Sequence, residues 1–295
     1  MFHNCQDYLA FSNYAYAVRL KVCGLENIGT FWRIVSGKKL RKLLLVRWSG
    51  QLTDGLFQAA LASYVLFSPE RQPNAMAAAT AFATVLLPYS IVAPFSGVIL
   101  DRFSRQQIIR NANFIRSILL IAIVFILFNN FSNIFLVSLV LCVFGMNRLI
   151  LAGLSASLPL TLDSDTKKEQ LISANAIAVT GGTIFVVIGG GLGIAIKRLL
   201  DSFVSSDNLD SLLIAIGVIG YLVAATLMYF FAKFELGPVE TKLNKSNQES
   251  NEVIEGFKIL RQHGDILRAI FAVSIQRSGI TSLTLMALLL ERNTF

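Results

Sequence analysis

The sequence predicts an all-α polytopic membrane protein, and three of its features carry this prediction. Hydrophobic residues make up 54% of the 295 residues and charged residues only 15%, whereas a soluble domain has about 25% charged residues. The mean hydropathy is +0.62. The apolar residues also gather in runs long enough to cross the hydrocarbon as helices, which takes about 20 residues. A soluble core could not hide this much apolar surface, but a lipid solvent removes that need.

Seven apolar runs are expected to form the spanning helices. Most separators between them are short and rich in turn-forming residues, such as the two prolines of residues 68–73. The longest connection, residues 234–265, is polar and of mixed charge, which suits a cytoplasmic linker between two helical bundles. The predicted spans are Leu43–Phe67, Ala75–Leu100, Ile108–Phe128, Ile134–Leu158, Leu171–Ile196, Ser211–Ala232 and Ile266–Leu290.

These runs divide the chain into four parts. Residues 1–40 have neither strong periodicity nor a spanning run. We expect them to form a poorly ordered cytoplasmic extension, or to be an upstream stretch that is not part of the natural product. The other parts are a six-helix bundle at 41–234, a cytoplasmic linker at 235–265, and a seventh helix with a short tail at 266–295.

The basic residues between the runs predict the orientation, because Lys and Arg accumulate in cytoplasmic connections. If the N-terminus is cytoplasmic, the inside segments hold 16 Lys and Arg residues and the outside segments only Arg71, Lys197 and Arg198. We therefore expect a multi-pass protein of the cell membrane with a cytoplasmic N-terminus and the lipid bilayer around it. The net charge of +8 forms no single basic patch, so a nucleic-acid partner is not expected.

The residue types that other classes of function need are missing from the sequence or misplaced in it. The cysteines, Cys5, Cys23 and Cys142, form no CxxC pair, so neither a disulfide framework nor a metal site is expected. Both histidines lie outside the apolar runs, which leaves an intramembrane serine hydrolase without a base. No GxxxxGK-S/T loop for nucleotides is present. We expect no enzyme and no cofactor, although a membrane subunit driven by a separate ATPase stays an open alternative.

A short motif follows the second apolar run. Residues 97–106 read GVILDRFSRQ. This segment resembles the loop signature of the major facilitator superfamily, GxxxD-R/K-x-G-R/K-R/K, and lies in the expected cytoplasmic connection. Ser104 stands in place of the second glycine of the signature, and Gln106 stands in place of its last basic residue.

Four residues of this loop are candidates for a conformational latch. Gly97 has no side chain, so the helix end can approach a neighbouring helix closely. Asp101 can pair with an arginine or cap a helix N-terminus. Arg102 and Arg105 can complete a charge cluster that forms in one conformation and breaks in the other. In the alternative interpretation, the arginines only enforce the topology.

Two further segments resemble the same superfamily. Residues 51–58, QLTDGLFQ, are similar to the first helix of its bacterial exporters, and Arg148 followed by Gly153 resembles its arginine-then-glycine motif. The resemblance covers residues 41–290. It implies a six-helix bundle of two inverted three-helix repeats, which is half of a transporter that works by alternating access. It also implies that the chain is truncated after its seventh helix, or that a second polypeptide or a second copy supplies the missing bundle.

The first helix carries a polar stripe that consists of Arg47, Gln51, Asp54 and Gln58. Their spacing of +4, +3 and +4 keeps them within about 60° of one helix face. A charge near the bilayer centre costs at least ~2.5–3.5 kcal/mol, so the stripe is expected to face protein or a water-filled cavity. Either it lines the path of the solute, with Asp54 as a proton or cation carrier, or Asp54 forms a buried ion pair with Arg148 or Arg116.

Arg148 lies near the middle of the fourth apolar run, with Ser155 two turns further along the same face. This arginine is a candidate partner for the solute or for a carboxylate on the solute path. Alternatively, it forms an ion pair that only orders the bundle. Because arginine does not deprotonate in proteins, it cannot itself carry a coupled proton.

The fifth apolar run has small residues on one face. The face consists of Asn175, Gly182, Gly189 and Gly193, which are spaced +7, +7 and +4. Small residues let helices pack closely, and glycine also permits bending during a rocking motion. Ile194 occupies the position at which the antiporters of the superfamily have a proline. We therefore predict a helix-packing face here and leave the antiporter assignment open.

Together these features predict a permease or exporter of major-facilitator type for an unidentified small solute. Coupling to an ion gradient, with the proton as first candidate, is expected because the sequence has no nucleotide-binding loop. The alternative is a transport-incompetent fragment, or a membrane subunit that only binds partner helices.

Overall fold

The computed structural model describes residues 37–61, 76, 95–97, 99–129, 133–162, 168–203, 206–232, 235–237, 260–262 and 264–294. Residues 1–36 of the predicted extension 1–40, most of the second apolar run and most of the linker lie outside these residues. Residues 38–40 of that extension belong to the first described helix and are not a poorly ordered segment. Within the described ranges the regular elements are helices, and no strand occurs there. The prediction of an all-α fold is therefore confirmed.

Six long helices match six of the predicted runs. They begin one to five residues earlier than predicted. Before the runs of α3, α5 and α7 the added residues are mainly lysine, arginine, glutamine and glutamate, which are good helix formers. The helices are α3 (Lys38–Leu61), α5 (Arg105–Phe128), α6 (Asn133–Ser157), α7 (Lys168–Leu200), α8 (Ser206–Leu227) and α10 (Gly264–Thr294). Two short 3-10 turns, η3 (Leu158–Thr161) and η4 (Met228–Phe230), follow α6 and α8.

Four of these helices are long and apolar enough to cross a membrane, so the chain is a multi-pass membrane protein. They span Arg105–Phe128, Phe135–Thr161, Gln170–Leu200 and Asn208–Phe230, with a mean hydropathy between 2.0 and 2.3. α3 is less apolar because the polar stripe lies in its middle. α10 is less apolar because it contains charged residues such as Arg277.

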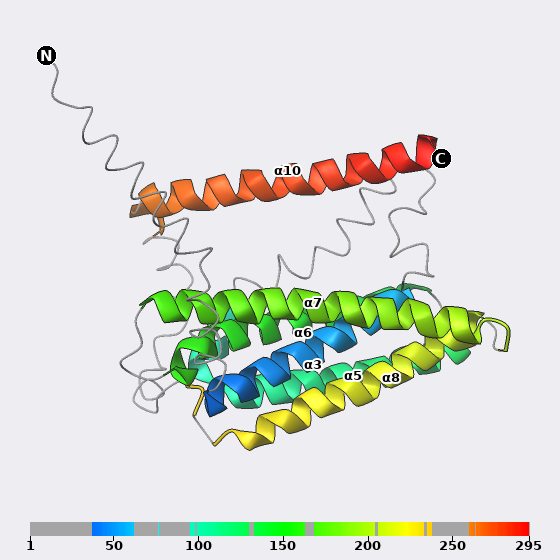
Figure 1. Ribbon diagram of the computed structural model, residues 1–295, viewed down its shortest axis with the longest axis horizontal. Helices are drawn as coiled ribbons and strands as arrows, with labels where there is room; N and C mark the ends of the chain where they lie inside the picture. The colour runs from blue at the N-terminus through cyan, green and yellow to red at the C-terminus, as the bar shows by residue number, and fades with distance from the viewer. Residues whose placement is uncertain are drawn as a thin grey trace, which may run out of the picture.

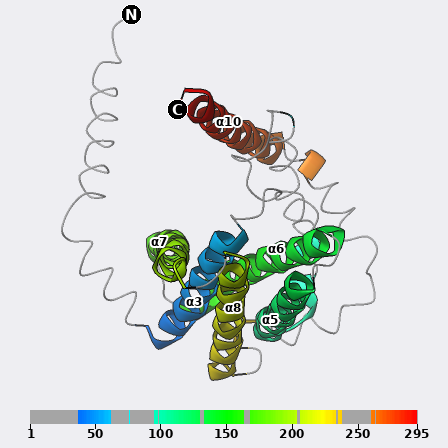
Figure 2. The ribbon, with the colours of Figure 1, turned by 90° about the vertical axis from the view of Figure 1, so that its right-hand side faces the viewer.

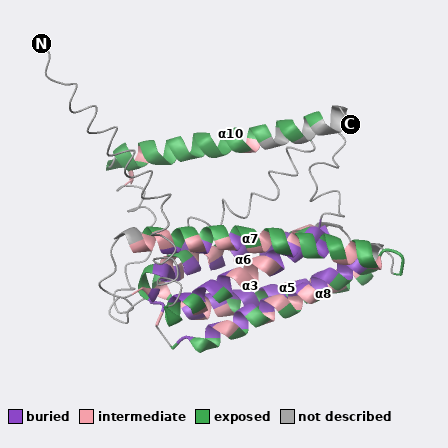
Figure 3. Ribbon diagram, viewed as in Figure 1, coloured by how far each residue is buried: buried purple, intermediate pink, exposed green. Residues whose placement is uncertain are grey.

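The five helices α3, α5, α6, α7 and α8 run side by side along the long axis of the molecule (Figure 1). Viewed end-on, α3 lies between α7 and α8, and α5 lies between α8 and α6 (Figure 2). α10 lies apart from these five helices, and nearly all of its described side chains are exposed (Figure 3). α3 is therefore the helix around which the bundle is built.

Two apolar clusters hold the bundle together, one near each end of α3. The first joins Leu40 and Leu44 of α3 to the end of α6 and to the turn after α8. The second joins Phe57 to α5, α6 and α8, where its ring meets that of Phe144 edge-on at 6.1 Å between centroids. In lipid the hydrophobic effect does not drive helices together, because lipid tails are as apolar as the side chains. Such contacts therefore stabilise the bundle through close packing. The polar residues 47–54 lie between the two clusters.

α3 and α7 approach so closely that their backbones touch. A Cβ atom added to Gly55 would overlap the carbonyl oxygen of Val186, and one added to Gly189 would overlap that of Leu52. Helices in membranes reach such contact where residues without a side chain lie at the crossing. The glycines therefore set the distance between α3 and α7.

Three of the four residues predicted to form the packing face of the fifth run are buried: Gly182, Gly189 and Gly193. A Cβ atom at Gly182 would overlap Oε1 of Gln51, a member of the polar stripe. Asn175 is exposed and does not take part in this contact. The bending role suggested for these glycines stays a prediction.

Candidate functional site

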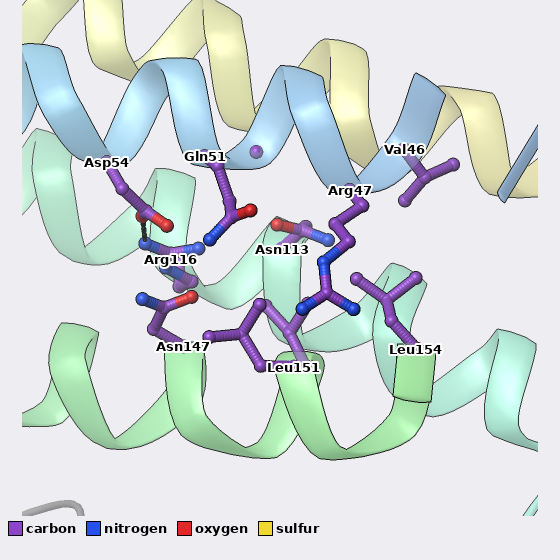
Figure 4. Close-up of a pocket in the computed structure, with 11 residues that line it drawn as sticks. Val46, Arg47, Gln51, Asp54, Asn113, Arg116, Asn147, Leu151 and Leu154 are labelled. Carbon is purple, nitrogen blue, oxygen red and sulfur yellow. Dashed lines mark hydrogen bonds and ion pairs between the residues drawn. The ribbon is translucent and has the colours of Figure 1, made fainter. Parts of the chain in front are cut away.

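A small polar cavity lies where α3, α5 and α6 face one another (Figure 4). Its volume is about 10 Å³, close to the least that one water molecule needs. Apolar residues of α3 and α6 complete its wall. The polar residues that line it are Arg47, Gln51 and Asp54 of α3, Asn113 and Arg116 of α5, and Asn147 of α6.

Asp54, Arg116 and Tyr221 form a buried charged cluster beside this cavity. Their relative exposures are 4%, 1% and 0%. Nη2 of Arg116 donates to Oδ1 of Asp54 and to the hydroxyl of Tyr221, and that hydroxyl donates to the same Oδ1 at 2.8 Å. The guanidinium carbon also lies 3.8 Å from the centroid of the Tyr221 ring. The cluster thus joins α3, α5 and α8 through one carboxylate.

The depth of this cluster explains its composition. Asp54 lies about 16 Å along α3 from Leu43, near the middle of a hydrocarbon core about 30 Å thick. A lone charge at that depth is costly, so intramembrane charges pair with one another. Of the two predicted partners for Asp54, the structure pairs it with Arg116. Its role as a proton carrier stays a prediction.

Arg47 lines the same cavity nearly two turns before Asp54 and is 8% exposed. Nη1 of Arg47 donates to Oγ of Ser155 at 3.4 Å, at the long end of the hydrogen-bond range. Nε of Arg47 has no hydrogen-bond partner among the described residues, and the same holds for Oε1 of Gln51 and Oδ1 of Asn113. The amide nitrogen of Asn113 donates to its own helix at Ile109, 3.0 Å away, which leaves the oxygen for the cavity.

The structure brings together three of the four stripe residues. Arg47, Gln51 and Asp54 line one cavity, whereas Gln58, one turn beyond Asp54, is exposed. Arg148 is also exposed and does not line this cavity. Its neighbour Asn147 lines the cavity instead, because adjacent residues of a helix point about 100° apart.

The predicted latch residues lie at the end of the bundle where α3 begins. Nη2 of Arg105 lies 3.5 Å from Oδ1 of Asp101, and Nη1 donates to the carbonyl oxygen of Ala156 at 2.8 Å. The backbone nitrogen of Arg105 donates to the carbonyl oxygen of Gly237 at 3.0 Å. Arg105 therefore connects the loop before α5, the end of α6 and the segment after α8.

The other two latch residues differ from each other in burial. Arg102 is half-buried, and Gly97 is exposed. A Cβ atom at Gly97 would meet no heavy atom within 4 Å, so the described residues provide no close helix approach at that position. Breaking and reforming of this cluster stays a prediction.

Three residues of the site are absent from the sequence-based prediction: Asn113, Asn147 and Tyr221. The signal for the first two is an amide inside an apolar run, which is costly in lipid unless it faces protein or a cavity. Asn113 also lies three residues before Arg116 and so shares its helix face. Tyr221 offers no comparable signal, because tyrosine is common in membrane helices at the lipid interface.

Comparison with known proteins identifies a family that the chain matches. The chain matches the family model described as Major Facilitator Superfamily over residues 43–294. Uncharacterised MFS-type transporters of Mycobacterium tuberculosis and Mycobacterium bovis are each 32% identical to it over 218 residues, or 74% of this chain. The match covers 46% of each relative. The chain therefore spans about half the length of the curated relatives it matches.

Proposed function

This chain belongs to the major facilitator superfamily, and from that premise we propose that it forms one helical bundle of a membrane transporter. The bundle takes part in moving a small solute by alternating access. The superfamily is a family of transporters and not of enzymes. Because the chain spans about half the length of its relatives, the second bundle of the path comes from further sequence, a second polypeptide or a second copy.

The observation that supports this proposal most strongly is the polar cavity inside an apolar bundle. Six polar side chains from three helices face it. Ionisable residues within membrane segments are costly and mark the pathways of substrates and ions. A bundle that served only as an anchor has no need of such a cavity.

We propose that Asp54 is the residue that couples transport to an ion gradient. It is the only acidic residue in the first six apolar runs of the sequence. Protonation removes its charge and weakens its attraction for Arg116, while Tyr221 loses an anionic acceptor. A conformation in which the cluster is separated then becomes relatively more favourable. A proton gradient can thereby shift the balance between the two conformations of alternating access.

We also propose that the protein lies in the cell membrane with its N-terminus in the cytoplasm. The excess of basic residues in the segments on that side supports this orientation. The Arg47 end of the polar stripe then lies nearer the cytoplasm than Asp54 does, since Arg47 precedes Asp54 on a helix that leaves the cytoplasm.

The exposed surface of α7 supports a partner bundle. Only 17% of the residues in its most apolar window are buried, against 33–44% in α5, α6 and α8. This surface also suits the alternative function, in which the chain only binds partner helices without transport. Flux measurements separate the two functions.

The test is proton and solute movement in proteoliposomes under an imposed pH gradient, with a panel of small organic solutes. We expect protein-dependent flux that depends on pH, and we expect Asp54→Asn to abolish that pH dependence. Asp265→Asn is the matched control, because this carboxylate is 97% exposed, and it should leave the flux unchanged.

Two outcomes contradict this proposal. If neither this chain nor a form completed with a second bundle moves any solute or proton, the transport function is wrong. If Asp54→Asn transports with unchanged pH dependence, Asp54 is not the proton carrier.

A further inference from the structure

The charges that line the cavity do not balance. Arg47 and Arg116 supply two positive charges and Asp54 supplies one negative charge. The carboxylate of Asp54 is already held by Arg116 and Tyr221. The guanidinium of Arg47 is therefore a buried cation without a carboxylate partner in the described part of the chain.

The sequence shows that no other acidic residue at this depth can compensate Arg47. Apart from Asp54, the first six apolar runs contain no aspartate or glutamate. This count includes the second run, so it holds for all six runs. The buried Asp210 of α8 precedes the sixth run and pairs with Lys197. A buried cation without a counter-charge is strongly unfavourable in a low-dielectric environment. The site is thus suited to a negative charge that the six apolar runs do not themselves contain.

Polar atoms at and around Arg47 also lack hydrogen-bond partners among the described residues. Nε of Arg47 lacks a partner among the described residues, and this side chain is more than nine-tenths buried. Oδ1 of Asn113, a residue that is 1% exposed, lacks one as well. Oε1 of Gln51 is instead packed against Gly182 of α7. Figure 4 shows the Arg47 guanidinium extending from α3 toward α6, with the Asn113 side chain beside it. The cavity thus offers a charged donor next to an amide acceptor.

We propose that Arg47 binds an anionic group, a carboxylate or a phosphate, and that Asn113 accepts a hydrogen bond from a hydroxyl or amino group next to it. As a statement about the solute, this inference rests on the proposed transport function. Guanidinium groups form short, charge-assisted hydrogen bonds to carboxylate and phosphate oxygens. The class of ligand is a small hydroxylated or aminated organic anion, or a free inorganic anion with the same chemistry.

The cavity must widen to admit such a ligand. Its present volume of about 10 Å³ suits one water molecule. α3 packs much less extensively against α6 than against α7, so the α3–α6 side can open while the glycine contact with α7 persists. Opening along this side exposes Arg47 and Asn113 together, because both line the same cavity.

Equilibrium binding of labelled anions to the full chain tests the proposal. The chain is placed in nanodiscs of phosphatidylcholine, whose headgroup has no net charge, and is titrated with glycolate, acetate and inorganic phosphate at constant ionic strength. We expect saturable binding of glycolate or phosphate, with glycolate tighter than acetate because acetate lacks the hydroxyl donor. Phosphate binding without glycolate binding identifies a free inorganic anion as the ligand.

Variants assign the binding to Arg47. Arg47→Gln should weaken it by about tenfold or more, the effect of losing one hydrogen bond to a charged group, and Arg47→Lys should keep most of it. Arg198→Gln is the matched control, because Arg198 is an exposed arginine at the far end of α7. Size-exclusion elution and helical circular dichroism establish that each variant is folded. If Arg47→Gln does not fold, Asn113→Leu is used, which should remove the preference for glycolate over acetate.

The inference is overturned if the chain binds none of the three anions saturably, or if Arg47→Gln binds them as tightly as the parent chain. Equal affinity for glycolate and acetate overturns the part that concerns Asn113. Binding needs no conformational cycle, so its result is independent of the flux experiment. If the chain binds an anion through Arg47 but shows no flux, the binding site is supported and the transport function is contradicted.

Discussion

α3 meets its neighbours through two faces that are built in different ways. Toward α7 the contact is made by glycines, and the backbones of Gly55 and Gly189 leave no room even for a methyl group. Toward α5 and α6 the middle of the contact, between the two apolar clusters, is made by long polar side chains, and a cavity remains between them. One helix therefore combines a close-packed contact with an open one.

The difference shows how a membrane bundle can be rigid on one side and adjustable on the other. Backbone contact between small residues gains packing energy only at one separation of the helices, so a small shift loses it. Polar side chains have several torsions and can follow a moving neighbour while they exchange partners. We expect changes at the two faces to act differently: substitutions at the glycines should affect assembly, and substitutions at the polar face should affect both stability and ligand binding.

The largest expected effect comes from breaking the buried ion pair. Arg116→Gln leaves the carboxylate of Asp54 without its counter-charge, and it should lower the free energy of unfolding by about 3–5 kcal/mol. The measurement is an unfolding titration with sodium dodecyl sulfate in mixed micelles, followed by circular dichroism.

The double variant Asp54→Asn/Arg116→Gln is the control for this interpretation. It should be more stable than Arg116→Gln alone, because it leaves no uncompensated charge. If the double variant is as unstable as the single one, loss of packing and not loss of charge balance explains the effect.

A smaller effect is expected at the glycine face. Gly189→Ala places a methyl group against the carbonyl oxygen of Leu52, and it should cost about 1–3 kcal/mol through overpacking. Gly191→Ala is the matched control, because a Cβ atom there would meet nothing within 4 Å. The same titration should show Gly191→Ala unchanged or slightly stabilised, since alanine favours a helix by about 1 kcal/mol over glycine. Equal losses at the two positions would contradict the close-contact interpretation.

The smallest effect is expected for Tyr221→Phe. This change removes the hydroxyl that links Arg116 to Asp54 and keeps the ring beside the guanidinium, so it should cost about 1 kcal/mol. Tyr229→Phe is the control, because Tyr229 is 69% exposed and should show no measurable change. If Tyr221→Phe destabilises as much as Arg116→Gln, the hydroxyl contributes more than one hydrogen bond to the cluster.

Much of the polar site could be predicted from the first helix alone. Helical periodicity predicts which residues share a face. Arg47, Gln51 and Asp54 line one cavity, as their spacing predicts. The periodicity does not state how far along the helix that cavity extends, and Gln58 lies beyond its end. Tyr221 could not be predicted, because 167 residues separate it from Asp54 and no local pattern relates the two.

The sequence by itself determined the all-α class and the membrane environment. An apolar run of about 20 residues is long enough to span the bilayer as a helix, and a helix satisfies its own backbone hydrogen bonds in lipid. It also determined which residues of α3 share a face. Only the tertiary structure decided that Asp54 pairs with Arg116, which faces the bundle interior, while Arg148 faces outward. The physical reason is that an ion pair depends on which faces of two helices meet, and packing between distant segments sets that choice.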